Sequence, residues 1–456
     1  MENTISAIST PIGIGGISVV RISGKEAFAV AERIFRSQTP FMDIKTHTVT
    51  YGKIVDQDEN TVDIVLMLKM SAPKTYTGED TVEIQCHGGQ YVTKKILEIT
   101  YKNGAVPAEP GEYTKRAFLN EKIDLMEAEA VMDLIASEAE DSYKDALSQL
   151  KGDKSQYIKE IRQELITLLS HIMVLIDYPE YDIDSLSAKE TKEKAEQIKE
   201  ELSDLSKNFN NGRIIRDGMT VAVVGEVNVG KSTFINKACG YNRVIVTDIA
   251  GTTRDVVEVK IDVNGLCVIL KDTAGIRKTD NEIEKIGIEK SKEAIEEADA
   301  VIYIEDINKP DNEEIPVYIK DMKKTICVLN KTDLLDKNNK ESYISSRENE
   351  LKHIFADRVI ACSLDKKEGI DEIFKNLLAL VNKGDVKQNK EAITNIRHKM
   401  HIDNAIEYLN NIKNSDFIDM MSVDLTCAAD ELGKITGETA STDIIEKIFE
   451  RFCVGK

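Results

Sequence analysis

The sequence contains no tryptophan, and aromatic residues make up only 5% of it. We therefore do not expect a surface that binds nucleic acid mainly by stacking bases on aromatic rings. No apolar run reaches the roughly 18 residues that a membrane span needs. The most apolar stretch, residues 166–178, is interrupted by Ser170, His171 and Asp177. The first ten residues, MENTISAIST, have neither a basic segment nor a continuous apolar core, so we expect no signal peptide.

Paired cysteines and an excess of positive charge are also missing. The seven cysteines lie far apart and include no C-x-x-C pair, which favours reduced thiols and a cytoplasmic protein. The chain has 60 Lys and Arg residues against 80 Asp and Glu residues, a formal net charge of −20. Such an acidic chain repels nucleic acid at long range. If it acts on RNA, a local basic patch or a partner protein must supply the attraction.

The chain is too long for one ordinary core, and its regions differ in pattern. Residues 1–120 mix β-branched runs with Gly-rich turns, which is typical of a small α+β domain. Residues 121–211 and 383–456 have apolar residues at helical spacing. Between them, residues 212–382 alternate strand-like runs with amphipathic helices, which predicts a parallel sheet covered by helices. We therefore expect an α/β domain inserted into a helical domain, with a linker at 210–218.

A phosphate-binding loop begins the α/β region. GEVNVGKS at 225–232 follows a strand-like run and precedes a helical segment. Its glycines allow the backbone to wrap around phosphates, with amide groups and a helix N-terminus facing the anion. Lys231 would reach the β- and γ-phosphates, and the Ser232 hydroxyl would bind magnesium.

Three further motifs follow in the order that a GTPase needs. DTAG starts at Asp272, which would hold the metal through water, and ends at Gly275, which would sense the γ-phosphate. NKTD ends at Asp333, whose carboxylate can accept both N1–H and N2–H of guanine. Adenine lacks the amine and would leave that carboxylate unpaired, which is costly. CSL at 362–364 ends the last strand, where a backbone amide contacts the guanine oxygen.

Together these motifs predict a Ras-like GTPase domain with a parallel sheet. The predicted GTP contacts are Asn228, Val229, Gly230, Lys231, Ser232, Thr233, Thr247, Asp248, Ile249, Ala250, Gly251, Thr252, Asp272, Thr273, Ala274, Gly275, Asn330, Lys331, Thr332, Asp333, Ser363, Leu364 and Asp365.

The hydrolytic machinery departs from the Ras pattern. Ras-type enzymes have a Gln after DxxG that orients the attacking water, whereas this chain has Ile276, which cannot do so. The chain is either a slow binding switch or an enzyme that uses other groups. The acids Asp280, Glu282 and Glu284 follow, and their pattern alone favours solvated residues near a helix N-terminus, where the helix dipole stabilises them.

The phosphate loop also contains Asn228, and TDIAGTTRD follows at 247–255. The Asn carbonyl and a loop of backbone carbonyls could hold a monovalent cation beside the phosphates. Potassium at that place would supply the charge that an arginine finger supplies in other GTPases.

These segments resemble the MnmE (TrmE) family of tRNA uridine-modification GTPases. The resemblance covers the whole chain and rests on TPIGIGGISVVRISG, GEVNVGKSTFIN, TDIAGTTRD, DTAGIR and the terminal CVGK. It implies a potassium-stimulated GTPase whose GTPase domains pair across a homodimer. It also implies an MnmG-like flavoprotein partner, in a heterotetramer whose FAD lies on the partner alone. The implied reaction adds a carboxymethylaminomethyl group at the wobble uridine (U34) of certain tRNAs.

The resemblance also implies roles for individual residues. Glu284 becomes the catalytic acid, which reverses the interpretation from pattern alone. Residues 1–120 would mediate dimerisation and bind 5-formyl- or methylene-tetrahydrofolate; an Arg and a Lys could hold its glutamate tail, and Glu83 could pair with the pterin N–H groups. The implied ligands are Ser232 and Thr253 for magnesium, Asn228, Thr247, Ile249 and Thr252 for potassium, and Arg21, Glu83, Lys122 and Lys456 for folate. One departure is Glu226-Val227, since many relatives have Pro before the Asn.

Cys453 lies in the terminal RFCVGK, between Arg451 and Lys456. For an arbitrary terminal Cys, the better interpretation is a small apolar residue that closes the last helix. Neighbouring cations favour the reactive thiolate, and the family keeps this Cys near the folate domain. The resemblance therefore favours a thiol that serves the modification chemistry or its geometry.

Two other classes of function remain open. The chain could be a GTP-dependent ribosome-assembly factor or RNA-binding switch, although such proteins usually carry a basic RNA-binding domain that this acidic chain lacks. Alternatively, its helical and N-terminal domains could merely recruit partners. Folate binding by residues 1–120 would separate the modification enzyme from both.

Overall fold

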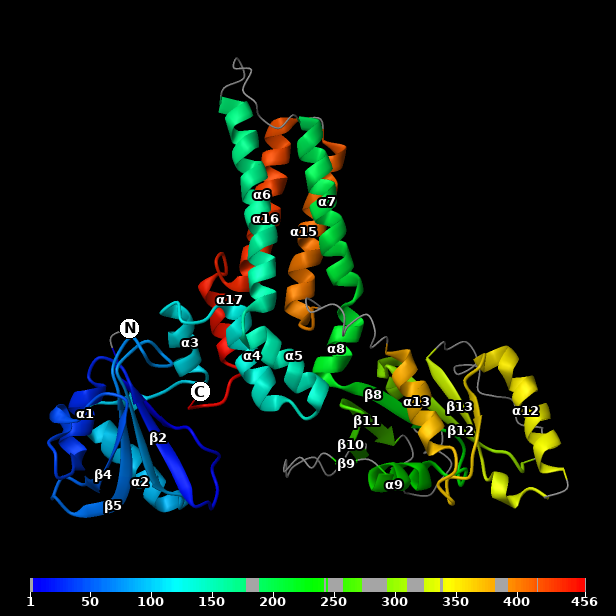
Figure 1. Cartoon of the computed structure of the whole chain (residues 1–456), viewed down its shortest axis with the longest axis horizontal. Coiled ribbons are helices and arrows are strands. Elements are labelled where there is room, and N and C mark those ends of the chain that lie inside the picture. Colours follow the sequence, from blue (N-terminus) through cyan, green and yellow to red (C-terminus); the bar gives the residue numbers. More distant parts are fainter. Residues whose placement is uncertain are drawn as a thin grey trace. The chain divides into compact units, whose positions relative to one another are not determined.

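The computed structural model describes residues 3–177, 188–241, 243–244, 257–272, 293–309, 324–336, 339–381, 393–415 and 417–455. The chain forms two compact units, drawn in Figure 1. Unit 1 comprises Met1–Met132, Gln149–Met173 and Leu425–Lys456, and unit 2 comprises Asp133–Ser148 and Val174–Asp424.

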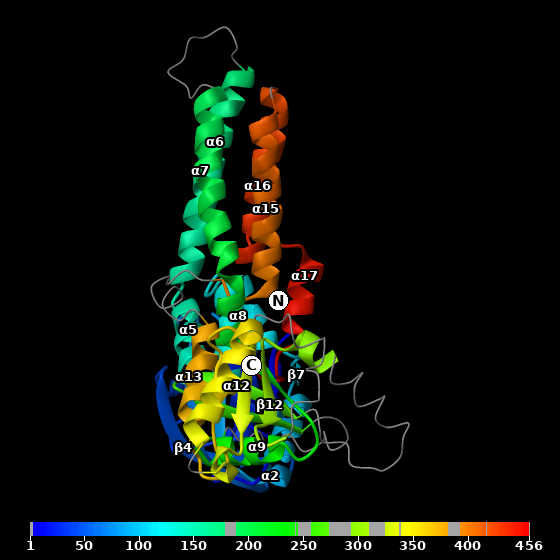
Figure 2. The ribbon, with the colours of Figure 1, turned by 90° about the vertical axis from the view of Figure 1, so that its right-hand side faces the viewer.

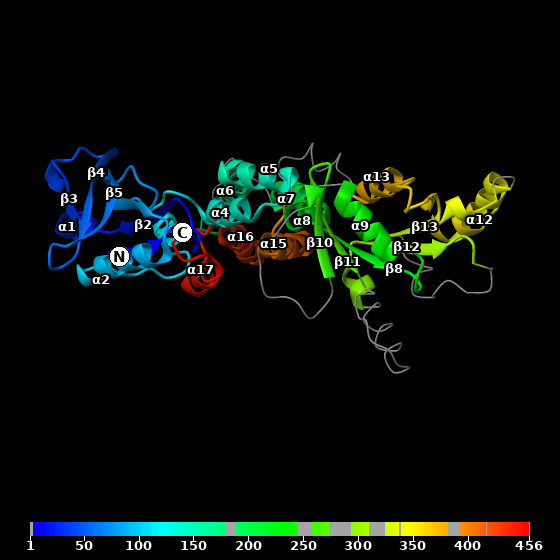
Figure 3. The same ribbon diagram turned by 90° about the horizontal axis from the view of Figure 1, so that it is seen from below.

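Unit 1 begins with a seven-stranded sheet of order β3-β4-β5-β6-β2-β1-β7, antiparallel except for the β1–β7 pair. One face packs on helices α1 and α2, which lie beside it in Figure 3. The elements are β1 (Ile5–Ile8), β2 (Ile17–Ser23), α1 (Ala27–Ile34), β3 (Phe35–Arg36), the 3₁₀ turn η1 (Phe41–Asp43), β4 (Thr48–Val55), β5 (Thr61–Met70), β6 (Thr81–His87), α2 (Gln90–Lys102), β7 (Val106–Pro107) and α3 (Glu112–Leu119).

Alternation along the strands explains this one-sided packing. In β5, Val65 and Met67 are buried against the helices, whereas Ile64 and Leu66 are exposed on the other face. Successive strand side chains point to opposite faces, so the exposed apolar residues share one surface. Tyr51 lies directly opposite Leu66 in the register and is also exposed.

The rest of unit 1 is helical and brings the C-terminus onto the N-terminal sheet domain. Arg162 joins two distant segments, because its Nε donates to the Ala429 carbonyl and its guanidinium pairs with Glu438. At the end of the chain, Val454 forms a β-bridge with Pro110. The helices are α4 (Leu125–Ala136), α5 (Glu140–Leu150), α6 (Asp153–Asp177), α16 (Ile418–Thr436) and α17 (Thr442–Phe449); parts of α4, α5, α6 and α16 belong to unit 2.

Unit 2 contains a second seven-stranded sheet, of order β14-β13-β12-β8-β11-β10-β9. Strands β14 to β11 are parallel, and β10 and β9 add antiparallel pairs at one edge. The elements are β8 (Met219–Val224), α9 (Lys231–Tyr241), β9 (Arg243–Val244), β10 (Val257–Val263), β11 (Leu266–Asp272), β12 (Ala300–Asp306), β13 (Thr325–Asn330), the 3₁₀ turn η2 (Thr332–Leu334), α12 (Lys340–Phe355), β14 (Val359–Ala361) and α13 (Ile370–Leu380).

Helices cover both faces of this sheet. Val221 and Val223 of β8 belong to a core with α9 and α13, whereas Ala222 and Val224 belong to a core with α12 on the other face. Strands covered on both sides are buried at nearly every position and are mostly apolar, as β8 and β13 are. The fold is therefore the predicted Ras-like α/β domain.

Two long helices from either side of this domain lie together in unit 2, as Figure 2 shows: α7 (Ala188–Lys207) and α15 (Ile396–Asn414). The Ser206 hydroxyl donates to Asp403, and Lys413 pairs with Glu196 at 3.4 Å. The α/β domain is therefore inserted into a helical domain, and the predicted fold class is confirmed. The predicted boundaries at 120, 211 and 382 remain predictions.

The linker predicted at 210–218 is wrong, because Phe209–Asp217 forms helix α8. Phe209, Ile214 and Ile215 are buried in it, and Gly212 lies so close to the Ile393 carbonyl that a Cβ would collide with it. The Asn and Gly residues favoured a loop in the sequence, but burial of these apolar side chains favours the helix. All seven cysteines, which lie among the described residues, are free. No helix in the described part of the chain is long and apolar enough to cross a membrane.

Candidate nucleotide-binding site

The phosphate loop joins the end of β8 to the first residue of α9. Gly225, Asn228 and Gly230 all have positive φ angles, of 145°, 66° and 115°. A Cβ on Gly225 would collide with the Ile304 carbonyl, and one on Gly230 would collide with Asn330. The loop therefore needs glycine at both positions, and Asn228 adopts the left-handed conformation that Asn tolerates better than most residues.

Lys231 and Ser232 begin helix α9, where the free amide groups of a helix face an anion. The Lys231 ammonium donates 2.6 Å hydrogen bonds to the carbonyls of Gly225 and Glu226, so it curls back over the loop. Ser232 is exposed next to it, and Thr233 follows in the same turn. This geometry fits a triphosphate cradle and leaves one hydroxyl oxygen, a hard ligand of the kind magnesium prefers.

Asn330 connects the phosphate loop to the predicted guanine-binding loop. Its Nδ2 donates to the Val229 carbonyl at 2.7 Å, and its Oδ1 accepts from the Leu364 amide at 3.0 Å. Both bonds are buried, and the Asn330 residue is itself 4% exposed. One side chain thus holds together motifs that are about a hundred residues apart in the sequence.

Asp333 lies in the turn η2, where it would face a guanine. The Ser363 hydroxyl donates to its Oδ1 at 2.7 Å, and this hydrogen bond lowers the pKa of Asp333 below its usual value. Thr332 is anchored through its amide to the Cys362 carbonyl at 3.1 Å. The carboxylate is therefore charged and fixed in place, as recognition of guanine N–H groups requires.

Lys331 is held in a left-handed conformation with φ of 66°. Its ammonium pairs with Asp306 at 2.7 Å, and Asn308 donates to its carbonyl at 3.0 Å. Burial would raise the pKa of Asp306, but hydrogen bonds from Lys331 and Asn308 outweigh that effect and lower it. At the far side of the loop, Lys237 donates to the Asp365 carbonyl.

Sequence reasoning did not find Asp306, Asn308 or the ion pair between Glu226 and Lys309. A signal was available for the first two, since residues just after the carboxyl end of a parallel strand line the ligand crevice of such sheets. The ion pair of Glu226 carried no such signal, because it joins two loops whose approach only the tertiary fold defines.

Several predicted residues lie outside the described residues or are only partly described. The backbone of Asp272 ends β11, but its side chain is outside the description. The predicted residues that lie wholly outside are Thr247, Asp248, Ile249, Ala250, Gly251, Thr252, Thr253, Thr273, Ala274, Gly275, Glu284 and Lys456.

The predicted folate residues Arg21 and Glu83 lie directly opposite each other on β2 and β6. Arg21 donates through Nε to Glu83 Oε1 at 2.8 Å, and both side chains are about one-fifth exposed. The Tyr113 ring lies 5.4 Å from the guanidinium, and its hydroxyl donates to the Arg21 carbonyl. Lys122 donates to the Pro73 carbonyl at 3.1 Å, on the loop between β5 and β6.

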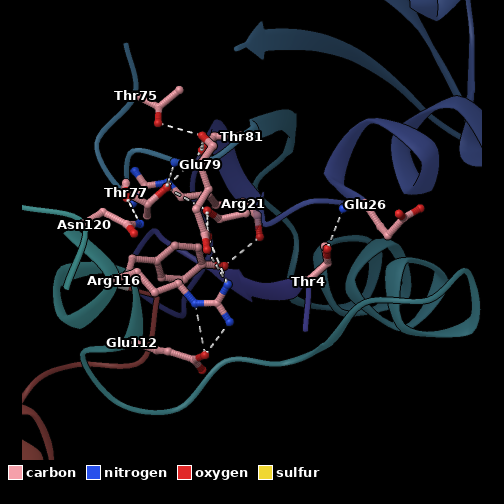
Figure 4. Close-up of polar contacts among 12 residues, drawn as sticks. Thr4, Arg21, Glu26, Thr75, Thr77, Glu79, Thr81, Glu112, Arg116 and Asn120 are labelled. Carbon is pink, nitrogen blue, oxygen red and sulfur yellow. Dashed lines mark hydrogen bonds and ion pairs between the residues drawn. The ribbon is translucent and has the colours of Figure 1, made fainter. Parts of the chain in front are cut away.

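A buried network of ion pairs and hydrogen bonds, shown in Figure 4, holds that loop in place. The Arg116 guanidinium, only 2% exposed, lies between Glu79 and Glu112 and bonds both carboxylates. Ser23 donates to Glu79, and Asn120 donates to the Thr77 carbonyl. This network fixes the loop beside Arg21. In the sequence, the four-residue spacing of Glu112 and Arg116 on one helix could have indicated the ion pair between them.

Two family models match most of the chain. One, described as the MnmE helical domain, matches residues 125–453, and the other, described as the N-terminus of the GTP-binding protein TrmE, matches residues 4–122. The tRNA modification GTPase MnmE of Acetivibrio thermocellus is 48% identical over 464 residues, covering 100% of this chain and 99% of the relative. The protein of that name from Clostridioides difficile (strain 630) is 41% identical and covers 100% of both chains.

Two solved structures match a smaller share of the chain. The FeoB G-domain from Methanococcus jannaschii is 26% identical, covers 36% of this chain and 97% of that chain, and has a TM-score of 0.26. The G domain of the T. maritima FeoB iron transporter is 23% identical, covers 36% and 99%, and has a TM-score of 0.27.

Proposed function

Because the chain belongs to the MnmE (TrmE) family of tRNA modification GTPases, we propose that it hydrolyses GTP to drive modification of the wobble uridine in certain tRNAs. In this proposal an MnmG-like flavoprotein is its partner, and the product carries a carboxymethylaminomethyl group at U34. Both relatives are named tRNA modification GTPases, and the chain aligns with 99% and 100% of their lengths.

The observation that carries the GTPase assignment is the convergence of three motifs on Asn330. Its amide joins Val229 of the phosphate loop to Leu364, and its neighbour Asp333 is held by Ser363. A polar side chain buried between two loops keeps the phosphate and base subsites at a fixed separation. The site thereby selects a nucleotide with a guanine at one end and phosphates at the other.

Magnesium and potassium would bind beside the phosphates. Magnesium fits the exposed Ser232 hydroxyl, with Thr253 as the second protein ligand, and potassium fits Asn228 with Thr247, Ile249 and Thr252. These ions would neutralise charge that develops on the phosphates during hydrolysis. Glu284 would accept or orient the proton of the attacking water. Asn228 supports this proposal because its left-handed backbone presents an exposed amide at the loop.

A tetrahydrofolate derivative would bind at the Arg21–Glu83 pair. Glu83 would accept from pterin N–H groups, while Arg21, Lys122 and Lys456 would hold the carboxylates of its tail. Binding of 5-formyltetrahydrofolate to the full-length protein, measured by calorimetry, tests this. Arg21→Ala should weaken binding at least tenfold, whereas Arg33→Ala, which removes an exposed cation of the same domain, should not. Equal affinities of the wild type and both variants for 5-formyltetrahydrofolate would refute a folate site at Arg21.

The chain would form a homodimer through the exposed face of the N-terminal sheet, its GTPase domains associating further during hydrolysis. That face presents Val49, Tyr51, Ile64 and Leu66 in adjacent strands. Contiguous exposed apolar surface of this kind marks an interface, and two-fold symmetry is the common arrangement. Leu66→Asp should give a monomer in sedimentation at micromolar concentration. Tyr91→Asp is the matched control, because Tyr91 is an exposed aromatic residue on α2. A dimer that survives Leu66→Asp would place the interface elsewhere.

The complete proposal is tested by nucleoside analysis of tRNA from a deletion strain. The modified wobble uridine should disappear and return with the wild-type gene but not with Asp333→Asn. An unchanged nucleoside profile in the deletion strain would refute the modification role. The net charge of −20 supports a division of labour in which the flavoprotein supplies much of the basic surface for tRNA. We place the protein in the cytoplasm, where tRNA and reduced thiols occur.

A ribosome-assembly or RNA-binding switch is the alternative. It shares the GTP site, so GTP hydrolysis alone does not separate the two. Folate binding and loss of the modified uridine would both be absent for such a switch.

A further inference from the structure

The β10–β11 hairpin connects the two segments in which this GTPase is expected to sense its nucleotide. Residues 247–255 precede β10, and Asp272, the start of DTAG, is the last residue of β11. The hairpin turn at Asn264 and Gly265, with φ of 52° and 87°, lies at the opposite end of both strands. A shift of the strand ends at the nucleotide would move this turn as well, because the two strands are paired along their whole length.

Residues 133–148, hereafter the α4–α5 corner, contact the middle of β10 and the hairpin turn. Both carboxylate oxygens of Glu138 accept from Lys260 Nζ of β10, at 2.8 and 2.7 Å. The Asp141 amide donates to the Gly265 carbonyl in the turn at 2.9 Å. The corner belongs to unit 2, whereas the residues before and after it belong to unit 1. It is therefore a part of the helical segment that packs in the same unit as the GTPase domain, as α7, α8 and α15 also do.

A second contact attaches the corner to α8, the helix before the strand that enters the phosphate loop. Arg216 of α8 donates through Nε and Nη2 to the two oxygens of Asp133, at 2.9 and 2.7 Å. Strand β8 starts two residues beyond the helix and pairs in parallel with β11. The corner thus contacts the GTPase domain at the β10–β11 hairpin and at the helix that leads into β8.

The Glu138–Lys260 pair is partly withdrawn from water. The side chains are 24% and 30% exposed, and Cys267 is buried beside them. Burial, with a further contribution from the Glu138 carboxylate, raises the pKa of the Cys267 thiol to about 11. In such surroundings a charge that loses its partner is destabilised more than at an open surface. Separation of the pair is therefore unfavourable, and a displacement of the hairpin would carry the corner with it.

We propose that the Glu138–Lys260 ion pair is a contact through which the helical domain responds to the nucleotide state of the GTPase domain. Glu138 is then a positioning residue that acts on the nucleotide site through the hairpin. Coupling between two sites is reciprocal for binding free energies. Breaking the pair must therefore change the relative affinity of the protein for GTP and GDP, although neither residue touches the nucleotide.

The test compares the full-length protein with Glu138→Gln, Lys260→Gln and the double variant. Fluorescent mant-GDP and the non-hydrolysable mant-GppNHp are titrated in magnesium and potassium, and thermal unfolding is recorded. The ratio of the two dissociation constants should change at least threefold, in the same direction in both single variants. The double variant should change it no further, because one interaction is lost in all three.

Lys144→Gln is the matched control, since Lys144 lies on the corner and pairs with Glu140 on the exposed surface of α5, away from the hairpin. An unchanged ratio in Glu138→Gln and Lys260→Gln, with only a lower unfolding temperature, would overturn the proposal and leave the pair a structural contact. So would an equal shift in the control. If the single variants fold poorly, the charge exchange Glu138→Lys with Lys260→Glu decides: it should restore folding and the wild-type ratio, and an altered ratio in the folded exchange variant also overturns the proposal.

Discussion

The Ser363 hydroxyl donates a hydrogen bond of 2.7 Å to Oδ1 of Asp333. The donor belongs to the loop after β14 and the acceptor to the turn after β13, so the bond joins two of the predicted guanine-binding motifs. It orients the carboxylate and lowers the pKa of Asp333. Two predictions follow from this pair, one about the base and one about pH.

Asp333→Asn should exchange the base preference of the site. The amide cannot accept two hydrogen bonds from guanine N1–H and N2–H, but it can donate to the extra carbonyl of xanthine. We expect affinity for GTP to fall by on the order of 10²-fold or more, with xanthosine triphosphate becoming the preferred nucleotide. Competition binding with the two nucleotides measures this. A variant that still prefers GTP would show that Asp333 does not read the base.

Ser363→Ala should make GTP binding more sensitive to acid. The pKa of Asp333 is lowered in the folded protein, so its carboxylate stays charged as pH falls below the usual Asp range. Binding is then lost only when pH falls through that lowered pKa. Without the Ser363 hydroxyl the pKa returns toward its usual value, and binding should be lost at a higher pH.

A pH titration of GTP affinity measures this shift. Ser342→Ala serves as the control, because that hydroxyl bonds the Asn339 carbonyl on α12 and does not touch the base site. Identical pH profiles for Ser363→Ala and the wild type would contradict the prediction.

The nucleotide site could be predicted from sequence because its requirements are local. Gly225 and Gly230 are needed by backbone angles within the loop, and Asp333 sits three residues after a strand with a readable pattern. Asn330 was placed in the guanine motif, but its bonds to the phosphate loop and to Leu364 were not foreseen. Those bonds depend on how strands pack, which residue spacing does not encode.

The contacts of the N-terminal domain were harder to predict from the sequence. Nothing in spacing connects Arg21 with Glu83, 62 residues apart. Strand register brings them together, and only the family resemblance had suggested either residue. The buried Arg116 is a sharper case, because an Arg four residues after a Glu on a helix usually indicates an ion pair on a solvated surface. Its burial depends on two carboxylates, Glu79 and Glu112, one of which comes from a distant loop.

Potassium stimulation should depend on the Asn228 side chain. Asn228→Ala should abolish the difference in hydrolysis rate between potassium and sodium while nucleotide affinity stays within a few-fold of the wild type. Because Asn228 has φ of 66°, Ala adds backbone strain of roughly 1 kcal/mol. Asn228→Gly removes the amide without that strain and should lose stimulation as well. Equal turnover of the wild type in the two ions would refute a potassium site.

Glu284 should act on the attacking water and not on nucleotide binding. Glu284→Ala should lower kcat by on the order of 10²-fold with little change in GTP affinity, as expected for an interaction made in the transition state. Single-turnover hydrolysis and equilibrium binding separate the two quantities. Glu282→Ala, two residues earlier, is the control and should stay active. Full activity of Glu284→Ala would return this residue to a solvated helix surface.

The C-terminal tail should serve the modification reaction through Cys453. The position of the tail can be tested separately from the Cys453 thiol. Cys453 is exposed while its carbonyl accepts from the Gly111 amide, and the Ser9 hydroxyl donates to the Gly455 carbonyl. Gly455 has φ of 95°, and a Cβ there would collide with the Ile8 carbonyl. Gly455→Ala should therefore displace the tail and leave the thiol intact.

Cys453→Ser keeps the size and hydrogen bonding of the side chain and removes only the thiol. We expect it to retain GTPase activity, folding and dimerisation and to lose wobble-uridine modification, measured on tRNA from complemented deletion strains. Gly455→Ala should lose modification too, because a displaced thiol cannot reach the reacting group. Full modification with Cys453→Ser would exclude thiol chemistry. If Gly455→Ala then still lost modification, the tail would contribute geometry alone, since its placement would matter and its sulfur would not.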